Sequence, residues 1–223
     1  DHLLGRFRAV AVLQQIEDFG DPTVTANDAF RPVSKYWDRI TRPEQLLVTL
    51  PRAMSVLTDA GECGPVTLAF CQDVQAEAYD YPEAFFAEVI WEQRRVRPDL
   101  SELARAATLL SKAKKPLIVA GGGVMYSGAA QILAKFADDR GIPVCETQAG
   151  KGTLAWNHPR NMGSVGVTGS SAANALAQEA DVVLGVGTRL QDFTSGSRAL
   201  FSNPDRKLIQ LNITVFDGHK HLA

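Results

Sequence analysis

The sequence predicts an α/β fold of the Rossmann type, in which a parallel β-sheet lies between two layers of helices. From residue 99 onward, short apolar runs alternate with segments of helical periodicity, which is typical of parallel α/β sheets. The apolar runs lack strict polar alternation, as expected for strands that are buried on both faces. Small and polar clusters follow several of these runs, and such sheets bind ligands beyond the carboxyl ends of their strands.

Ahead of this domain, the chain predicts one helix followed by one buried strand. In residues 43–58 apolar side chains recur at helical spacing, and Pro43 suits the first turn. We expect a kink or a break at Pro51, because its ring removes a backbone donor and crowds the preceding turn. Residues 64–70 form a short apolar run rich in β-formers, which predicts a buried strand.

Residues 72–98 show no sustained periodicity and predict a connecting segment that packs along a domain surface. This stretch is first acidic and aromatic and then basic. Its aromatic side chains could form a binding stripe, but a long connection also needs such anchors to stay ordered. We therefore favour packing over ligand contact for Tyr79, Tyr81, Phe85, Phe86 and Trp91.

The second domain begins with a capped helix. Asp99 is placed to cap a helix whose apolar residues recur from Leu100 to Leu110, and the cations of "KAKK" follow at its negative end. Three glycines then separate a strand from a helix that Gly141 closes. The strands of this domain are expected at 116–120, 142–146, 181–187 and 207–211, with a further helix at 170–180 and a new element beginning in 212–223.

Composition and charge exclude several classes of function. The 223 residues include 23 basic and 25 acidic side chains, for a net charge of −2, so no global field favours nucleic acid or an anionic membrane. No apolar stretch is long enough for a membrane span. The three cysteines lie far apart, two of them in or beside apolar runs, which suits a reducing compartment. We therefore expect a cytoplasmic protein that binds neither nucleic acid nor membrane.

The stretch "PLIVAGGGVMYSGA", residues 116–129, is either a cradle for a cofactor phosphate or a sharp corner of the fold. Gly121 and Gly123 match the first two glycines of the dinucleotide fingerprint, but Tyr126 occupies the third position. A Walker loop is excluded because its Lys and Ser/Thr are absent. Glu146 falls about where a ribose-binding acid is expected, although it could equally be a solvated strand end.

The residues by themselves offer no catalytic set and no metal site. His219 and His221 could ligate a metal, but no cysteine or carboxylate has suitable spacing to them. No nucleophile elbow of the GxSxG type occurs. Cys145 lies within an apolar strand, and we expect it to be an inert core residue rather than a nucleophile.

Several motifs occur in a fixed order along nearly the whole chain. "SKYWDRITRPEQL" and "GPVTLAFCQDVQ" are followed by the "GGG" turn, by "GIPVCETQAGKG" and by "ADVVLGVGTRLQDFTSG". In this order they resemble the thiamine diphosphate-dependent enzymes of the acetohydroxyacid synthase type. The resemblance implies that residues 1–78 are the C-terminal part of a pyrimidine-binding domain, 79–98 a linker and 99–223 a central, nucleotide-binding-like domain.

Within that family, "NDAFRPVSKYWDRI" and "QDVQAEAYDYPEAFF" are most similar to a member that acts in inositol breakdown. The similarity implies hydrolysis of a carbon–carbon bond, which opens a cyclic 1,2-dione to 5-deoxyglucuronate. An acetolactate synthase-like or malonic semialdehyde decarboxylase-like thiamine enzyme is the alternative within the family. A stand-alone nucleotide-binding module is the alternative from another class. Cys71 departs from the proline that usually precedes "QDV" in the family.

The resemblance also implies thiamine diphosphate and magnesium as cofactors of the full-length enzyme. The family's catalytic glutamate belongs to the early half of the pyrimidine-binding domain and its "GDG" magnesium motif to a third domain. Neither is matched here, and "FDG" at 216–218 is not that motif. We therefore expect this chain to be an inactive middle piece of a homodimeric or homotetrameric enzyme that acts on a small-molecule substrate.

The central domains of relatives hold FAD or ADP in some members and no nucleotide in others. Because hydrolysis needs no redox step, we interpret "GGG" chiefly as a corner of the fold, with FAD or ADP binding as the alternative. The residues that such a nucleotide would contact are Gly121, Gly122, Gly123, Thr168, Gly169, Thr188 and Arg189. Lys35 matches a family lysine near the substrate channel and is a candidate on the substrate side, or else a surface lysine.

Overall fold

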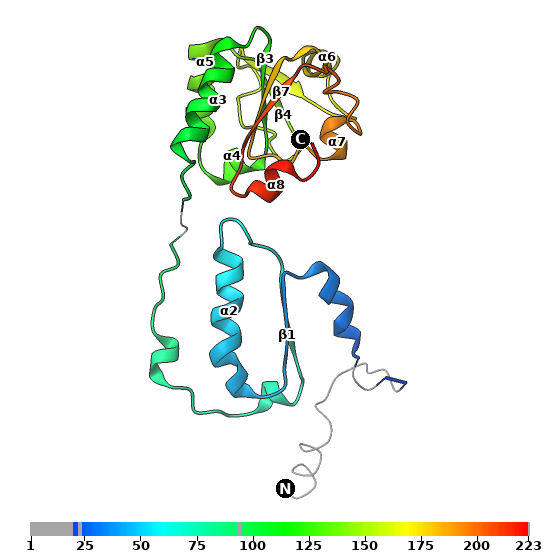
Figure 1. The fold of residues 1–223 in the computed structure, drawn as a ribbon. Coiled ribbons are helices and arrows are strands. Elements are labelled where there is room, and N and C mark those ends of the chain that lie inside the picture. Colours follow the sequence, from blue (N-terminus) through cyan, green and yellow to red (C-terminus); the bar gives the residue numbers. More distant parts are fainter. Residues whose placement is uncertain (1–19, 22–23, 93–94, 223) are drawn as a thin grey trace, which may run out of the picture. The chain divides into compact units, whose positions relative to one another are not determined.

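The computed structural model describes residues 20–21, 24–92 and 95–222. The chain divides into two compact units, Asp1–Arg95 and Val96–Ala223 (Figure 1), and each is described by itself. This division falls within residues 79–98, for which a linker is expected. Among the described residues, no helix combines the length and the apolar character that crossing a membrane requires.

The first unit contains a β-α-β arrangement (Figure 1). Strand β1 (Tyr36–Ile40) runs parallel to β2 (Val66–Phe70), and helix α2 (Leu46–Thr58) lies between them in the chain. The strand expected at 64–70 is therefore present, beginning two residues later. The unit also contains the 3₁₀ helices η1 (Ala26–Val33), η2 (Pro43–Gln45), η3 (Val74–Ala76) and η4 (Glu83–Phe86).

Helix α2 continues through Pro51, so the break that we considered there does not occur. Pro51 is exposed, whereas Thr49 and Ala53 form the buried side of the helix. The Thr49 hydroxyl donates a hydrogen bond of 2.6 Å to Asp38 Oδ2, which connects α2 to β1. Packing and this polar contact therefore outweigh the single backbone hydrogen bond that proline removes.

The aromatic side chains after β2 pack mainly against one another. The Tyr81 ring stacks on Phe85 with ring centroids 5.2 Å apart, and Tyr79 meets Tyr81 edge-on at 4.7 Å. The Tyr81 hydroxyl donates to the carbonyl oxygen of Pro43 at 2.8 Å. The hydrogen bond connects this segment to η2, and the ring contacts pack its aromatic side chains together, as expected for Tyr79, Tyr81 and Phe85. Phe86 remains 71% exposed.

The second unit is a five-stranded parallel sheet in the order β5-β4-β3-β6-β7. Its strands are β3 (Pro116–Ala120), β4 (Val144–Glu146), β5 (Asn161–Ser164), β6 (Val182–Val186) and β7 (Lys207–Leu211). Its helices are α3 (Leu100–Lys112), α4 (Gly122–Tyr126), α5 (Ala130–Arg140), α6 (Ser171–Glu179), α7 (Asp192–Ser195) and α8 (Val215–His219).

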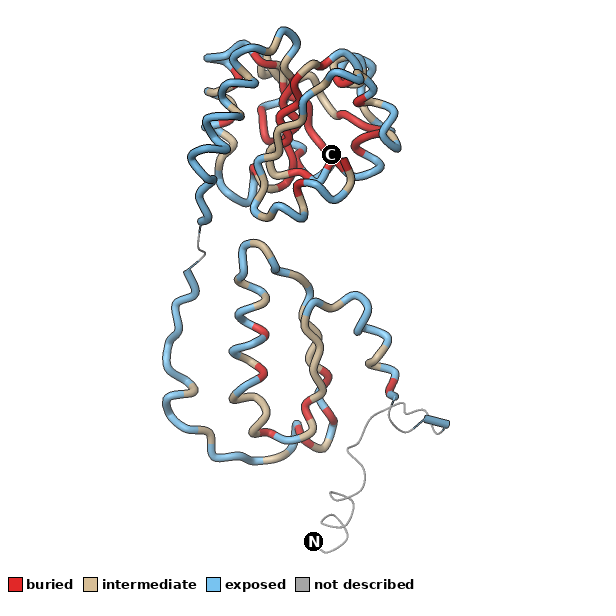
Figure 2. The backbone as a smooth tube through the Cα atoms, viewed as in Figure 1, coloured by how far each residue is buried: buried red, intermediate tan, exposed pale blue. Residues whose placement is uncertain are grey.

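Alternate residues of the strands build a separate core on each face of this sheet. Leu117 and Val119 of β3 belong to a cluster that includes Ala173 and Ala177 of α6. The intervening Ile118 of β3 belongs to a second cluster that includes residues of α5. Figure 2 shows the buried residues concentrated along the strands. The predicted three-layer α/β fold with a parallel central sheet is therefore confirmed.

Two local features differ from the expected elements. The helix expected after the three glycines is split into α4 and α5, because Gly128 adopts a left-handed φ of 66° between them. Strand β5 was not expected, since its sequence "NMGS" lacks β-branched and aromatic residues. It forms because its backbone pairs with β4, including Val144 opposite Asn161.

Candidate functional site

The strand order creates a switch point between β3 and β6. Strands β3, β4 and β5 succeed one another in one direction, whereas β6 and β7 extend the sheet on the other side of β3. Open α/β sheets bind ligands in the crevice at such a point, beyond the carboxyl ends of the strands. The turn after β3 carries Gly121–Gly123, and the turn after β6 carries Gly187–Arg189. Most of the predicted nucleotide-contacting residues therefore lie at this switch point.

The two glycine turns approach each other too closely for side chains. A Cβ atom on Gly121 would lie 2.3 Å from the carbonyl oxygen of Gly187, and one on Gly123 would lie 2.6 Å from the Gly187 Cα. Gly187 itself has a left-handed φ of 58°. In the neighbouring turn, a Cβ on Gly150 would lie 2.1 Å from the Ala120 carbonyl oxygen. Packing of backbone against backbone alone therefore accounts for these glycines.

Two of the three amides in the turn after β3 already have backbone partners. The Gly121 N–H donates to the Val186 carbonyl oxygen at 2.8 Å, and the Gly123 N–H donates to the Gly187 carbonyl oxygen at 3.0 Å. A phosphate cradle requires amides that point at the ligand. Gly121 and Gly123 therefore do not fit that role, and helix α4, which Gly121 caps and which contains Gly123, has only five residues.

The remaining predicted nucleotide contacts are distributed over two turns. Thr188 is buried, and its hydroxyl accepts a hydrogen bond from the Leu190 N–H at 3.2 Å. Arg189 and Thr168 are exposed. Gly169 closes a turn after β5 by donating to the Gly166 carbonyl oxygen at 2.9 Å. Arg189 is thus the one predicted contact that presents a charge to solvent.

Glu146 is neither a solvated strand end nor an open acceptor for a ribose. Its side chain is 5% exposed, and its Oε1 accepts a hydrogen bond from the Leu154 N–H at 2.9 Å. The carboxylate therefore fixes the loop that follows β4. Burial and the neighbouring Glu146 charge raise the pKa of the Cys145 thiol to about 12, so Cys145 is the inert core residue that the sequence predicts.

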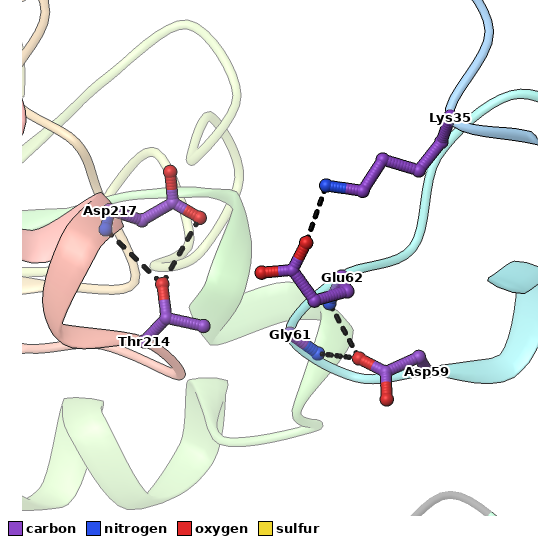
Figure 3. A network of polar contacts seen from close by, with 6 residues as sticks. All are labelled: Lys35, Asp59, Gly61, Glu62, Thr214 and Asp217. Atoms are coloured by element: carbon purple, nitrogen blue, oxygen red, sulfur yellow. Dashed lines mark hydrogen bonds and ion pairs between the residues drawn. The ribbon is translucent and has the colours of Figure 1, made fainter.

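Lys35 lies in the first compact unit, at the start of β1 (Figure 3). Its ammonium forms an ion pair with the Glu62 carboxylate, and both side chains are substantially exposed. Glu62 ends a turn in which the Gly61 and Glu62 amides donate hydrogen bonds to the Asp59 carboxylate. These hydrogen bonds hold the pKa of Asp59 below its ordinary value. Such an exposed pair agrees with the surface-lysine interpretation.

The described residues contain no group of three His, Cys, Asp or Glu side chains placed to hold a metal ion. The "FDG" aspartate at 217 belongs to a helix cap (Figure 3). Its amide donates to the Thr214 hydroxyl at 3.1 Å at the start of α8.

Gly150 and Gly187 are structurally required glycines that lie in the quoted motifs "GIPVCETQAGKG" and "ADVVLGVGTRLQDFTSG" but were not among the predicted nucleotide contacts. A Cβ on Gly150 would lie 2.1 Å from the Ala120 carbonyl oxygen, and one on Gly187 would lie 2.5 Å from the Gly123 Cα, so neither position has room for a side chain. Their signal in the sequence is a glycine one or a few residues beyond an apolar run, as in "VLGVGT" and "TQAGKG".

Comparison with known proteins identifies the family of this unit. A family model described as the central domain of thiamine pyrophosphate enzymes matches residues 103–222. The chain belongs to this family. Thiamine pyrophosphate is another name for thiamine diphosphate, so the family predicted from the motifs is confirmed.

Three relatives share about half of their aligned residues with this chain. Those from Clostridium perfringens and Geobacillus thermodenitrificans are each 50% identical over 209 residues, and that from Clostridium tetani is 48% identical over 209 residues. All three are named 3D-(3,5/4)-trihydroxycyclohexane-1,2-dione hydrolase. The alignments cover 94% of this chain but 32–33% of the relatives, so the chain spans about a third of their length.

Proposed function

We propose that this chain is part of a thiamine diphosphate-dependent hydrolase that opens trihydroxycyclohexane-1,2-dione by cleaving a carbon–carbon bond. The product would be 5-deoxyglucuronate, and the reaction would belong to inositol breakdown. One observation carries this proposal: 50% identity to hydrolases of that name extends over 209 residues and so includes both compact units. It favours the hydrolase over the acetolactate synthase-like and decarboxylase-like alternatives.

Within such an enzyme, this chain would supply scaffold rather than reacting groups. Thiamine diphosphate, when bound, supplies an electron sink for the carbanion, and the protein must add a carboxyl acid and a cation that holds the diphosphate. The described residues offer no metal-binding group, and no segment of this sequence matches the family's glutamate or "GDG" motif. We therefore propose that the 223-residue chain alone is inactive.

The glycine turns at the switch point are proposed to work as a closed corner without a nucleotide. This follows from the Gly121 and Gly123 amides, which donate to backbone carbonyls instead of facing a ligand. Purified chain should show no flavin absorbance and release no adenine nucleotide on denaturation. Stoichiometric FAD or ADP in the released material would instead support the nucleotide-binding alternative.

The test compares the full-length enzyme with this chain under identical conditions. With thiamine diphosphate and Mg²⁺, we expect the full-length enzyme to convert the cyclic dione, and the 223-residue chain to give no turnover. Pyruvate condensation and malonic semialdehyde decarboxylation serve as competing assays. Faster turnover in either competing assay would replace the hydrolase by the corresponding alternative, and turnover by the chain alone would refute the scaffold role.

The assembly and location of the full-length enzyme are part of the same proposal. We propose a cytoplasmic homodimer or homotetramer, as the family resemblance implies. Light scattering on the full-length enzyme measures its mass directly, and a monomer would contradict the proposed assembly.

A further inference from the structure

Helix α3 exposes the side that a helix of an α/β domain normally buries. Among the described α-helices of nine residues or more, α3 is the one without a buried residue, whereas α2, α5 and α6 each bury two. Figure 2 shows α3 exposed along most of its length. Its contact with the core comes from Leu110, which is partly buried against the cluster that includes residues of α5.

The exposed residues of α3 include an apolar stripe on one side of the helix. Side chains at i, i+3, i+4 and i+7 lie on one face of a helix, and in α3 these positions are Leu100, Leu103, Ala104 and Ala107. Leu100 is 80% exposed and Leu103 is 51% exposed, and both alanines are exposed as well. A contiguous apolar stripe of this kind marks a surface for a protein partner. We call these four residues the α3 stripe.

The other side of α3 is polar, so the helix is amphipathic. Glu102 and Arg105 form an exposed ion pair of 3.7 Å there, and Lys112 is exposed on the same side. Leu109 also lies away from the α3 stripe and is 37% exposed. The stripe is therefore a distinct face of the helix, and Leu109 offers a matched leucine outside it.

The charges at the two ends of α3 have opposite signs. Asp99 and Glu102 lie at its start, whereas Lys112 and Lys114 lie at and just beyond its end, where both are exposed. Antiparallel packing of two copies of α3 brings the acidic end of each helix to the basic end of the other. Parallel packing would bring like charges together, which is unfavourable. Charge complementarity thus favours a second, antiparallel copy of α3 as the occupant of the stripe.

The sizes of the side chains in the α3 stripe favour the same arrangement. In an antiparallel pair centred on the stripe, Leu103 of one copy lies opposite Ala107 of the other, so a large side chain meets a small one. In a parallel pair each leucine would face its own copy, and so would each alanine. Facing helices pack closely when large and small side chains alternate across the contact.

We propose that the α3 stripe is a dimer contact, packed antiparallel against the α3 stripe of a second copy of this chain. An antiparallel pair has two-fold symmetry, so association stops at two copies. One helix pair is smaller than the about 800 Å² per partner of a stable interface, and we therefore expect a weak dimer with a dissociation constant on the order of 100 μM. This contact names a surface for the proposed homo-oligomer but does not depend on hydrolase activity.

Sedimentation equilibrium of the 223-residue chain measures this association. We expect the average mass to rise from that of a monomer toward that of a dimer between about 10 and 500 μM. Leu103→Gln places an amide in the middle of the α3 stripe and should weaken dimerisation at least about tenfold, because two-fold symmetry counts each change twice. Leu109→Gln makes the same change outside the stripe and should leave dimerisation unchanged. Circular dichroism checks that both variants remain folded.

Two results of this experiment would overturn the proposal. Equal weakening by Leu103→Gln and Leu109→Gln would show that the stripe is not the contact. A chain that stays monomeric at every concentration would assign the stripe to another part of the full-length enzyme. Neither result changes the hydrolase assay or the mass of the full-length enzyme, so the proposed function is judged separately.

Disulfide cross-linking tests the antiparallel direction. The same register brings position 100 of one copy near Ser111 of the other and keeps the two copies of position 100 apart. In a Cys63→Ser background, which removes the exposed native thiol, a mixture of Leu100→Cys and Ser111→Cys chains should form mixed disulfides. Faster cross-linking of Leu100→Cys chains with themselves would show parallel packing, and equal cross-linking in all samples would show random encounters. Either result would contradict the antiparallel dimer.

Discussion

At the scale of single residues, the lack of space around their Cα atoms explains why glycines stand at the switch point. Gly121 has an ordinary negative φ of −107°, so alanine would fit its backbone conformation. The obstacle is the Gly187 carbonyl oxygen, 2.3 Å from the position of an added Cβ. Gly128 is the reverse case, since its φ is 66° but nothing lies within 4 Å of an added Cβ.

This contrast gives the first prediction. Gly121→Ala should reduce the free energy of unfolding by roughly 1–3 kcal/mol or more, because the two turns must move apart. Gly128→Ala should reduce it by only about 1 kcal/mol, from left-handed strain alone. Urea unfolding followed by circular dichroism measures both changes. Equal losses would mean that the turns adjust freely and that close packing does not explain the "GGG" sequence.

The three cysteines provide a second prediction at the same scale. Cys145 and Cys71 are fully buried, and burial raises the pKa of Cys145 to about 12, whereas Cys63 is exposed. Iodoacetamide at neutral pH should therefore alkylate Cys63 in the native chain and leave the other two unmodified. Peptide mass spectrometry reads out the three sites, with a urea-unfolded sample as the control in which all three react. Rapid native labelling of Cys145 would contradict the buried strand β4.

At the scale of elements, aspartates hold both ends of α3. Asp99 is its N-cap and accepts hydrogen bonds from the Ser101 and Glu102 amides at 2.8 and 3.2 Å. After the helix, Asp181 accepts from the Lys114 and Lys115 amides at 2.7 and 2.9 Å. Because α3 has no buried residue, these polar contacts are important for its placement on the second unit.

Both contacts lower a carboxyl pKa and so predict acid sensitivity. The Ser101 hydroxyl and the two amides at the helix start lower the pKa of Asp99 below its ordinary 3.8. Burial would raise the pKa of Asp181, but the Lys114 and Lys115 amides outweigh it and the net change is a decrease. A lowered folded-state pKa stabilises the fold fully above the unfolded value. That stabilisation is lost as the pH falls through the folded value.

We therefore expect stability to decline as the pH falls from about 5 to below 3. Asn can still cap a helix and cannot titrate, so the double variant Asp99→Asn, Asp181→Asn should show a shallower decline than the native chain. Urea unfolding at a series of pH values measures the slopes. Parallel slopes for the two proteins would assign the acid sensitivity to other carboxylates.

Some of these elements could be predicted from the sequence and others could not. Strands β3, β6 and β7 and the Asp99 cap were predictable, because each depends on local apolar runs or on a side chain beside the amides it caps. Strand β5 was not, because its pairing with β4 is a non-local property that "NMGS" does not encode in its own side chains. Of the kink or break expected at Pro51, the break does not occur for a similar reason, since contacts from Thr49 and Ala53 hold the helix in place.

At the scale of the whole molecule, the predicted site was located by topology rather than by a motif. Glycine clusters after strands indicated the carboxyl edge of the sheet, and the observed order places two of them at the β3–β6 switch point. The sequence could not reveal that Gly121 and Gly123 use their amides on Val186 and Gly187, because that pairing requires strands distant in the chain to be adjacent.

The two compact units also differ in how completely each covers its own core. The second unit has buried clusters on both faces of a five-stranded sheet. In the first unit, the buried hydrophobic cluster consists of Ile40, Cys71 and Val74, beside a sheet of two strands among the described residues. Two strands with one helix bury too little apolar surface for high independent stability. The second unit should therefore be the more stable one.

Limited trypsin digestion tests this difference in stability. Cleavage should occur early after Arg95, which is exposed in a segment without regular structure, and a fragment starting at Val96 should persist while the first unit is degraded. A chain of residues 96–223 should then unfold at nearly the same temperature as the second transition of the 223-residue chain, because its two cores are internal to it. Mass spectrometry of the digest and calorimetry of both chains provide the measurements. If the shorter chain proves unfolded, the central domain depends on contacts from the first unit, and its three-layer sheet is not an independent folding unit.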